Sequence, residues 1–133
     1  MGCERVMTNG EPGGICLTRT TSRLILLHTN DVHSCFENMP KLAAAIRRFR
    51  AAHAPEDLLI VDCGDHMDRM RGETEGTGGE ANVAVLNATG CEAFVPGNNE
   101  GLTFTRGQLE RAFAGASFAV LGTNLTDRYG TRP

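Results

Sequence analysis

Four side chains that could bind a divalent cation stand in three short segments of the sequence. Asp31 and His33 are two residues apart in the first segment. Asp65 follows a glycine in the second segment, and Asn98 follows a Pro-Gly pair in the third. Carboxylate, amide oxygen and neutral imidazole suit Mn²⁺, Zn²⁺, Fe²⁺ or Ni²⁺, and a carboxylate can bridge two such ions about 3.5–4 Å apart. These residue types therefore predict a divalent-metal site.

Each short motif is a weak signal alone, because Asp-x-His and Gly-Asp sequences are more often turns than metal sites. Their position behind predicted strands gives them more weight. Short apolar runs predict four strands, of which the first two have the pattern of strands buried on both faces: residues 24–27, 58–61, 93–95 and 118–121. The candidate ligands follow the first three of these runs.

Helical patterns separate the predicted strands. Three helices are predicted: residues 38–52, residues 81–88, and a helix opened by a capping box at Thr105. Asn38 is expected to cap the first helix, whose inner face is expected to hold Leu42, Ile46 and Phe49. Gly90 is expected to end the second helix. Strands alternating with helices predict an α/β fold, a mainly parallel sheet with flanking helices, in which ligands bind beyond the carboxyl ends of the strands.

The segments that carry the candidates resemble three motifs of a known family. The sequence His-Thr-Asn-Asp-Val-His at 28–33 is similar to the opening motif of the calcineurin-like metallophosphoesterases, specifically their 5′-nucleotidase branch. Val-Asp-Cys-Gly-Asp at 61–65 resembles the second motif, and Pro-Gly-Asn-Asn-Glu at 96–100 resembles the third, usually written Gly-Asn-His-Glu. The resemblance implies that residues 23–133 are the N-terminal part of a metallophosphoesterase domain, preceded by a flexible leader at 1–22.

The resemblance also implies a role for each candidate. Asp31 and His33 would hold the first of two divalent cations, drawn from Mn, Zn, Fe or Ni. Asp65 would bridge both cations, and Asn98 would bind the second through its side-chain oxygen. The implied reaction is hydrolysis of small phosphomonoesters, nucleotides among them, by a metal-bound water in line with the phosphorus.

One departure from the family pattern lies in the third motif. Asn99 stands where the family has a histidine that would protonate the leaving oxygen or stabilise the transition state. Leu102 occupies the position of that histidine's usual aspartate partner. Asn99 can donate a hydrogen bond to a phosphate oxygen but cannot titrate, and loss of general-acid assistance costs about 10²–10⁴-fold in rate. A full-length relative is therefore expected to favour substrates with good leaving groups.

A second departure is that no histidine follows Asn98, whereas the family completes its site with histidines from the second half of the domain. The second cation would have only Asp65 and Asn98, so one weakly bound ion is expected for this chain alone. The family's four-layer α/β/β/α sandwich would likewise be an incomplete half, with a sheet face left open for self-association. The alternative hypothesis is a truncated, non-catalytic remnant with weak metal binding or an interaction role.

The glycines, the net charge, the apolar runs and the cysteines bear on several other functions and settings. A Gly-x-Gly-x-x-Ala sequence at 76–81 suggests dinucleotide binding, but it lies far beyond the strand predicted at 58–61, where a tight junction is required. The net charge of −3 argues against a nucleic-acid polymer as partner. No apolar run is long enough for a membrane span. Five cysteines without a Cys-x-x-Cys pair predict a cytoplasmic setting, with Cys63 and Cys91 as core residues.

Overall fold

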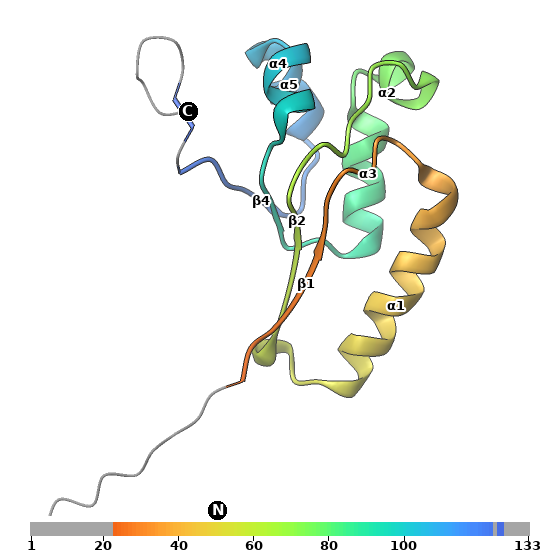
Figure 1. Ribbon diagram of the computed structural model, residues 1–133, viewed down its shortest axis with the longest axis vertical. Helices are drawn as coiled ribbons and strands as arrows, with labels where there is room; N and C mark the ends of the chain where they lie inside the picture. The colour runs from red at the N-terminus through yellow and green to blue at the C-terminus, as the bar shows by residue number, and fades with distance from the viewer. Residues whose placement is uncertain (1–22, 124, 127–133) are drawn as a thin grey trace, which may run out of the picture.

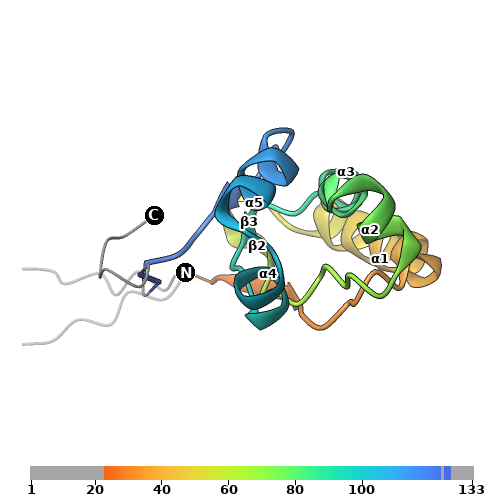
Figure 2. The ribbon, with the colours of Figure 1, turned by 90° about the horizontal axis from the view of Figure 1, so that it is seen from above.

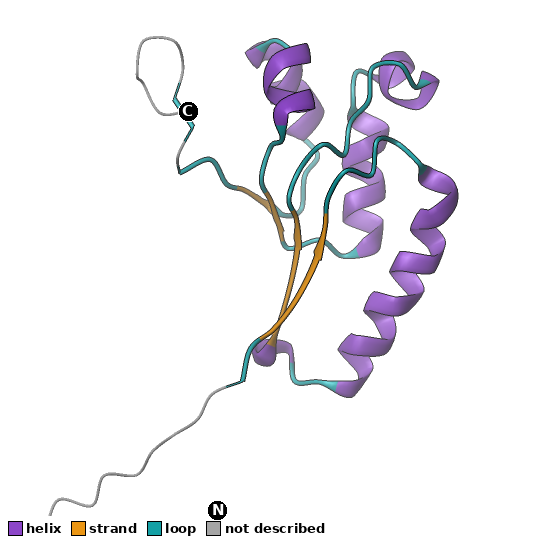
Figure 3. Cartoon of the chain, in the orientation of Figure 1, coloured by secondary structure: helices purple, strands orange, loops and turns teal. Residues whose placement is uncertain are grey.

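Four short strands form one parallel sheet in the computed structural model, which describes residues 23–123, 125 and 126 (Figures 1 and 3). The strands are β1 (Ile25–Thr29), β2 (Leu58–Asp62), β3 (Ala93–Phe94) and β4 (Ala119–Val120), in the spatial order β1-β2-β3-β4. All three pairings are parallel, which confirms the predicted α/β class. The leader expected at 1–22 and the last residues of the expected domain lie outside the described residues.

The helices that connect the strands form a layer on one face of the sheet. They are α1 (Met39–Ala52), α2 (Gly72–Thr77), α3 (Glu80–Thr89), α4 (Asn98–Thr103) and α5 (Arg106–Phe113), with 3₁₀ turns at Phe36–Asn38 and Pro55–Asp57. Because each strand pairs with the next in sequence, right-handed crossovers put the connections on the same side. α1 packs against α3, and α3 against α5, and Figure 2 shows α1, α2 and α3 together beside the strands. Among the described residues, no helix has the length and hydropathy needed to cross a membrane.

The other face of the sheet is not covered by any described element. Along β1, Ile25 and Leu27 pack toward α1, whereas Leu26 between them is 53% exposed. Its partner on β2, Leu59, is 37% exposed. The prediction that these strands are buried on both faces is wrong, because the described residues supply helices to one face only. The open face agrees with the expectation of an incomplete sandwich.

Two apolar clusters join the sheet to the helices. The smaller one lies under α1 and holds Ile46 at its centre, with Leu42 packed against it as predicted. The larger one lies under α3 and α5 and consists of Met67, Val83, Leu86, Cys91, Phe94, Phe104, Ala112 and Phe118. Burial of each large apolar side chain contributes roughly 1.5–3 kcal/mol. Phe49 lies on the same inner face as predicted and lines a pocket there with Leu42 and Ile46, although 41% of its surface is exposed.

Two of the three predicted helix ends have the backbone conformation or the hydrogen bonds that the sequence predicts. Gly90, with φ of 82°, ends α3 in the left-handed conformation. Thr105 and Gln108 form the predicted capping box of α5. Asn38 occupies the N-cap position of α1 as predicted, but it makes no side-chain cap bond, because its backbone angles are helical and its Oδ1 accepts from Lys41 Nζ.

Candidate metal centre

The loops that follow β1, β2 and β3 meet at the carboxyl edge of the sheet (Figure 1). Two backbone hydrogen bonds of 3.0 Å tie the first loop to the second: Asp31 N–H donates to Gly64 O, and His33 N–H donates to Asp65 O. The third loop is tied through the Asp65 side chain, whose Oδ1 accepts from the Asn99 N–H over 2.7 Å. The segments that carry the candidate ligands are therefore fixed relative to one another by hydrogen bonds, of the main chain between the first two loops and of the Asp65 side chain to the third.

Four non-glycine residues in these loops have left-handed backbone conformations. Their φ values are 54° for Asp31, 46° for His33, 55° for Ser34 and 51° for Asp65. This region costs a non-glycine residue roughly 1–2 kcal/mol, and such strain gathers at functional sites where the surrounding structure maintains it. Three of the four residues are predicted metal ligands, so the strain is concentrated where the sequence predicts chemistry.

Asp31, His33 and Asp65 each place one ligand atom within 4.8 Å of the other two. His33 Nε2 lies 3.6 Å from Asp31 Oδ1, so Nε2 is the ring nitrogen on the cluster side. Asp31 is exposed and the other two are half-buried, so the cluster opens to solvent. Two carboxylates and an imidazole in this arrangement could hold one divalent cation.

The side-chain amide of Asn98 completes the group. In the orientation that satisfies its hydrogen bonds, its Nδ2 donates to Asp65 Oδ2 over 2.9 Å and its Oδ1 accepts from the Asn99 N–H over 3.2 Å. Turning the amide by 180° brings Oδ1 beside Asp65 Oδ2. Both oxygens are ligand atoms, so the chemistry of the donor set also fits a shared cation.

Asn99 lies beside this cluster with its amide turned toward the protein. Its Nδ2 lies 3.1 Å from His33 Nδ1 and donates to Met67 O over 3.2 Å. Leu102, at the position of the family's aspartate, is 82% exposed. Asn98 and Asn99 form the first turn of α4.

Glu100 is a buried residue to which the sequence assigned no role. Its side chain accepts three backbone hydrogen bonds: Oε2 from Gly97 at 2.8 Å and Asp65 at 3.0 Å, and Oε1 from Met67 at 2.9 Å. Glu100 is 0% exposed, so these bonds are shielded from water and join the third loop to the second. The signal in the sequence was its spacing, three residues after Gly97, which lets a glutamate reach back to a helix start.

Two glycines allow the second and third loops to touch. A Cβ at Gly64, where φ is 95°, would lie 2.3 Å from Gly97 N and 2.6 Å from Val95 O. A Cβ at Gly97 would lie 2.3 Å from Asp65 Oδ1. A larger residue at either position would push the loops apart and separate Asp65 from Asn98.

A buried polar network lies behind the second loop. Ser34 Oγ lies 2.5 Å from Thr74 Oγ1, and Asn82 bonds both hydroxyls over 2.9 Å. Asn82 Nδ2 also lies 3.2 Å from Nδ1 of His66. All four residues are 0% exposed, and burial lowers the pKa of His66 to about 4. His66 is therefore a neutral residue behind the candidate ligands.

Burial also affects the groups at the end of β2. Asp62 accepts from Thr29 Oγ1 over 2.6 Å and from Gly64 N–H, yet burial outweighs these bonds and raises the pKa of its carboxyl group. Cys63 is exposed, so its predicted core position is wrong, because alternation along the strand turns it away from the side of Asp62. Cys91 is buried as predicted, and burial raises the pKa of its thiol to about 11.

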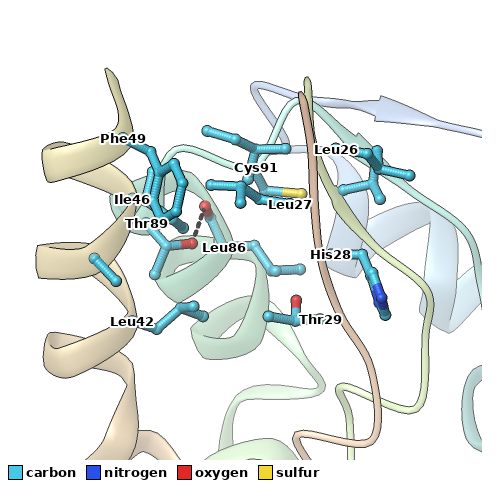
Figure 4. A pocket seen from close by; sticks show the side chains of 13 residues that line it. Leu26, Leu27, His28, Thr29, Leu42, Ile46, Phe49, Leu86, Thr89 and Cys91 are labelled. Carbon is cyan, nitrogen blue, oxygen red and sulfur yellow. Dashed lines mark hydrogen bonds between the residues drawn. The ribbon is translucent and has the colours of Figure 1, made fainter. Parts of the chain in front are cut away.

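A separate cavity of about 320 Å³ lies between α1, α3 and the edge strand β1 (Figure 4). Leu42, Ile46 and Phe49 of α1 and Leu86 of α3 line it, and none of the four candidate ligands does. Its lining is mainly apolar, so it offers no cluster of catalytic groups.

The glycine-rich sequence at 76–81 spans the end of α2 and the start of α3. No strand directly precedes it among the described residues. It therefore lacks the strand–turn–helix context that a dinucleotide-binding motif requires.

The chain belongs to the calcineurin-like phosphoesterase family, whose model matches residues 24–131. The metallophosphoesterase YunD of Bacillus subtilis (strain 168) is 43% identical over 113 residues, covering 84% of this chain and 24% of that protein. The snake venom 5′-nucleotidases of Gloydius brevicauda and Naja atra are 29% and 27% identical over 118 residues, or 77% of this chain. The matched region covers 20% and 22% of the lengths of those two proteins.

The fold is shared with a solved structure, the NAD nucleotidase NadN of Haemophilus influenzae. The TM-score is 0.68 at 24% identity, over 80% of this chain and 22% of that one. The chain thus spans about a quarter or less of the length of the relatives it matches. The resemblance predicted from the three motifs is confirmed.

Proposed function

We propose that the protein containing this chain is a metal-dependent phosphoesterase that acts on small phosphate esters at the carboxyl edge of the sheet. Family membership supports the reaction class. The observation that carries the proposal is the convergence, from three loops, of Asp31, His33, Asp65 and Asn98.

Each residue has a definite task in this proposal. Asp31 and His33 Nε2 hold one divalent cation. Asp65 Oδ1 is already bonded to the Asn99 N–H, which leaves Oδ2 aimed at Asn98 and available to a cation. A bound cation supplies Lewis acidity, which lowers the pKa of water and neutralises charge on phosphoryl oxygens. A second cation would receive only Asp65 and Asn98 from this chain, so its remaining ligands would come from further parts of a longer protein.

Nucleotides are the proposed substrate class. Two relatives of this chain are snake venom 5′-nucleotidases, and the proposal extends their printed activity to this protein. Asn99 cannot donate a proton to the leaving oxygen, because an amide does not titrate. Rates across a series of phosphate monoesters should therefore fall as the pKa of the leaving group rises. A flat dependence, with chemistry shown to limit the rate, would contradict this role of Asn99.

A metal titration combined with a phosphatase assay tests the proposal. The chelator-treated chain is titrated with Mn²⁺ or Zn²⁺ and assayed with p-nitrophenyl phosphate and AMP. Asp65→Asn should lower turnover by about 100-fold or more, because metal-ion stabilisation is worth several kcal/mol. Glu110→Gln is the matched control, since Glu110 is exposed on α5 and pairs with Arg106.

The alternative is a non-catalytic remnant with weak metal binding or an interaction role. One weak cation site without turnover in any metal would support the remnant and contradict catalysis by this chain. Turnover that Asp65→Asn abolishes and Glu110→Gln retains would support the enzyme.

The proposal extends to a reducing, cytoplasmic setting. Among the described residues, Cys35, Cys63 and Cys91 are free thiols, which suits such a setting. Self-association through the open sheet face is proposed as well, because Leu26 and Leu59 are exposed there.

A further inference from the structure

Asp68 contacts the His33 ring from the side away from the metal-ligand cluster. The distance from Asp68 Oδ2 to His33 Nδ1 is 3.7 Å, whereas Asp31 lies on the Nε2 side. The other carboxylate oxygen, Asp68 Oδ1, accepts from the Met70 N–H over 2.8 Å. This bond leaves Oδ2 facing the histidine.

The backbone of Asp68 is anchored to the buried polar network. Its N–H donates to Ser34 Oγ over 3.2 Å and lies 3.4 Å from Thr74 Oγ1. Ser34 is the residue next to His33 and is itself 0% exposed. The network therefore fixes Asp68 relative to the loop that carries His33.

The two groups at His33 Nδ1 differ in what they can accept. A neutral imidazole has one proton, so ligation of a cation through Nε2 puts that proton on Nδ1. Asn99 Nδ2 is 3.1 Å from Nδ1, but it is a donor, bonded also to Met67 O. Asp68 Oδ2 can accept, and a shift of about 0.8 Å from 3.7 Å brings it to hydrogen-bond distance.

We propose that Asp68 is a positioning residue that selects the metal-binding tautomer of His33. This inference rests on the proposed function, because it requires His33 to be a metal ligand. Without a cation, Nδ1 accepts from Asn99 and Nε2 carries the proton. With a cation on Nε2, the Nδ1–H donates to Asp68. Asp68 and Asn99 therefore act on metal affinity in opposite directions.

Calorimetric titration of the 133-residue chain with Mn²⁺ tests this opposition. Asp68→Asn retains an oxygen for the Met70 N–H but presents a donor to Nδ1, so the affinity should weaken about 10- to 100-fold. Asn99→Ala removes the competing donor, so the affinity should stay unchanged or tighten by up to about 10-fold. Glu75→Gln is the matched control, because it removes one charge from an exposed side chain paired with Arg69 and should change the affinity less than about twofold.

The ring ¹⁵N chemical shifts of a histidine-labelled chain give a readout that depends on neither affinity nor turnover. The proton of His33 should move from Nε2 in the cation-free chain to Nδ1 in the Zn²⁺-loaded chain. The Nδ1 proton should exchange slowly with water in the wild type and fast in Asp68→Asn. The His33→Gln variant assigns the signal among the four histidines of the chain.

Each outcome decides the inference. Equal affinity of wild type and Asp68→Asn overturns it and leaves the proposed function intact. Equal weakening by Asp68→Asn and Asn99→Ala also overturns it, because both side chains would then be merely structural. A wild-type chain that binds neither Mn²⁺ nor Zn²⁺ overturns the inference and the assignment of Asp31, His33 and Asp65 as a cation site of this chain alone. If Asp68→Asn does not fold, the Mn²⁺ affinity of Asn99→Ala and the position of the His33 proton in the wild-type chain still test the inference.

Discussion

Glu100 offers a test of how the three loops are held together, because glutamine in its place changes one terminal atom of a fully buried side chain. In the structure, Oε2 accepts from the Asp65 and Gly97 N–H groups, and Oε1 accepts from that of Met67. Glutamine replaces one of these acceptors by an N–H₂ donor. Whichever way the amide is turned, at least one buried backbone N–H then faces another donor.

The effect of Glu100→Gln on the free energy of unfolding can be estimated from these three hydrogen bonds. The better orientation keeps the oxygen at the Oε2 position and leaves the Met67 N–H without an acceptor, which costs about 1–3 kcal/mol. The two retained bonds change from charge-assisted to neutral and weaken by about 1 kcal/mol each. Removing a buried carboxylate also relieves its desolvation cost, which offsets part of this loss. The expected decrease in the free energy of unfolding is about 2–4 kcal/mol.

Urea unfolding followed by circular dichroism measures this decrease. With an m-value of about 2 kcal/mol/M, the midpoint of Glu100→Gln should fall by about 1–2 M. The control is Glu110→Gln, whose side chain is 63% exposed and bonds Arg106 over 2.8 Å, so about 0.2–1 kcal/mol is expected. Equal midpoints for the two variants would refute the reasoning that Glu100 joins the loops.

Three further outcomes are expected. The free energy of unfolding should fall by about 3 kcal/mol as the pH is lowered from 6.5 to about 4, because the pKa of His66 is about 4 in the folded state and near 6.5 in the unfolded state, which takes up the proton. The urea midpoint of His66→Gln should not show this dependence on pH. Maleimide labelling, read by peptide mass spectrometry, should modify Cys63 in the native chain and Cys91 only in denaturant, and equal native labelling would contradict their burial. Replacing Leu26 and Leu59 by lysine should reduce self-association in sedimentation experiments, whereas a parent chain that stays monomeric would exclude that role of the open face.

The sequence predicted the parts of this fold that depend on local order. Apolar runs alternate with helical patterns, so the strand sequence and the parallel sheet follow from chain order alone. Because Asp31, Asp65 and Asn98 each follow a strand, parallel pairing was enough to predict that they lie at one edge. The capping box at Thr105 and the stop at Gly90 are equally local signals.

The features that the sequence did not predict depend on tertiary contacts. α2 and α4 have six residues each, too few for an isolated helix, so α2 depends on its packing against α3 and α4 on the bonds of Glu100 at its start. The contact between Asp68 and His33 joins residues of two different loops, which no local pattern in the sequence specifies. The exposure of Leu26 depends on what lies beside the sheet, which its apolar neighbours in sequence cannot specify.

The strand order β1-β2-β3-β4 has a consequence for how the chain folds during synthesis. Each strand pairs with the strand made just before it, so every pairing can form as soon as its second strand has left the ribosome. No described pairing has to wait for a later segment to insert between earlier strands. The loops with Asp31, Asp65 and Asn98 can therefore meet on the nascent chain, while the open face around Leu26 and Leu59 remains a surface that chaperones can bind.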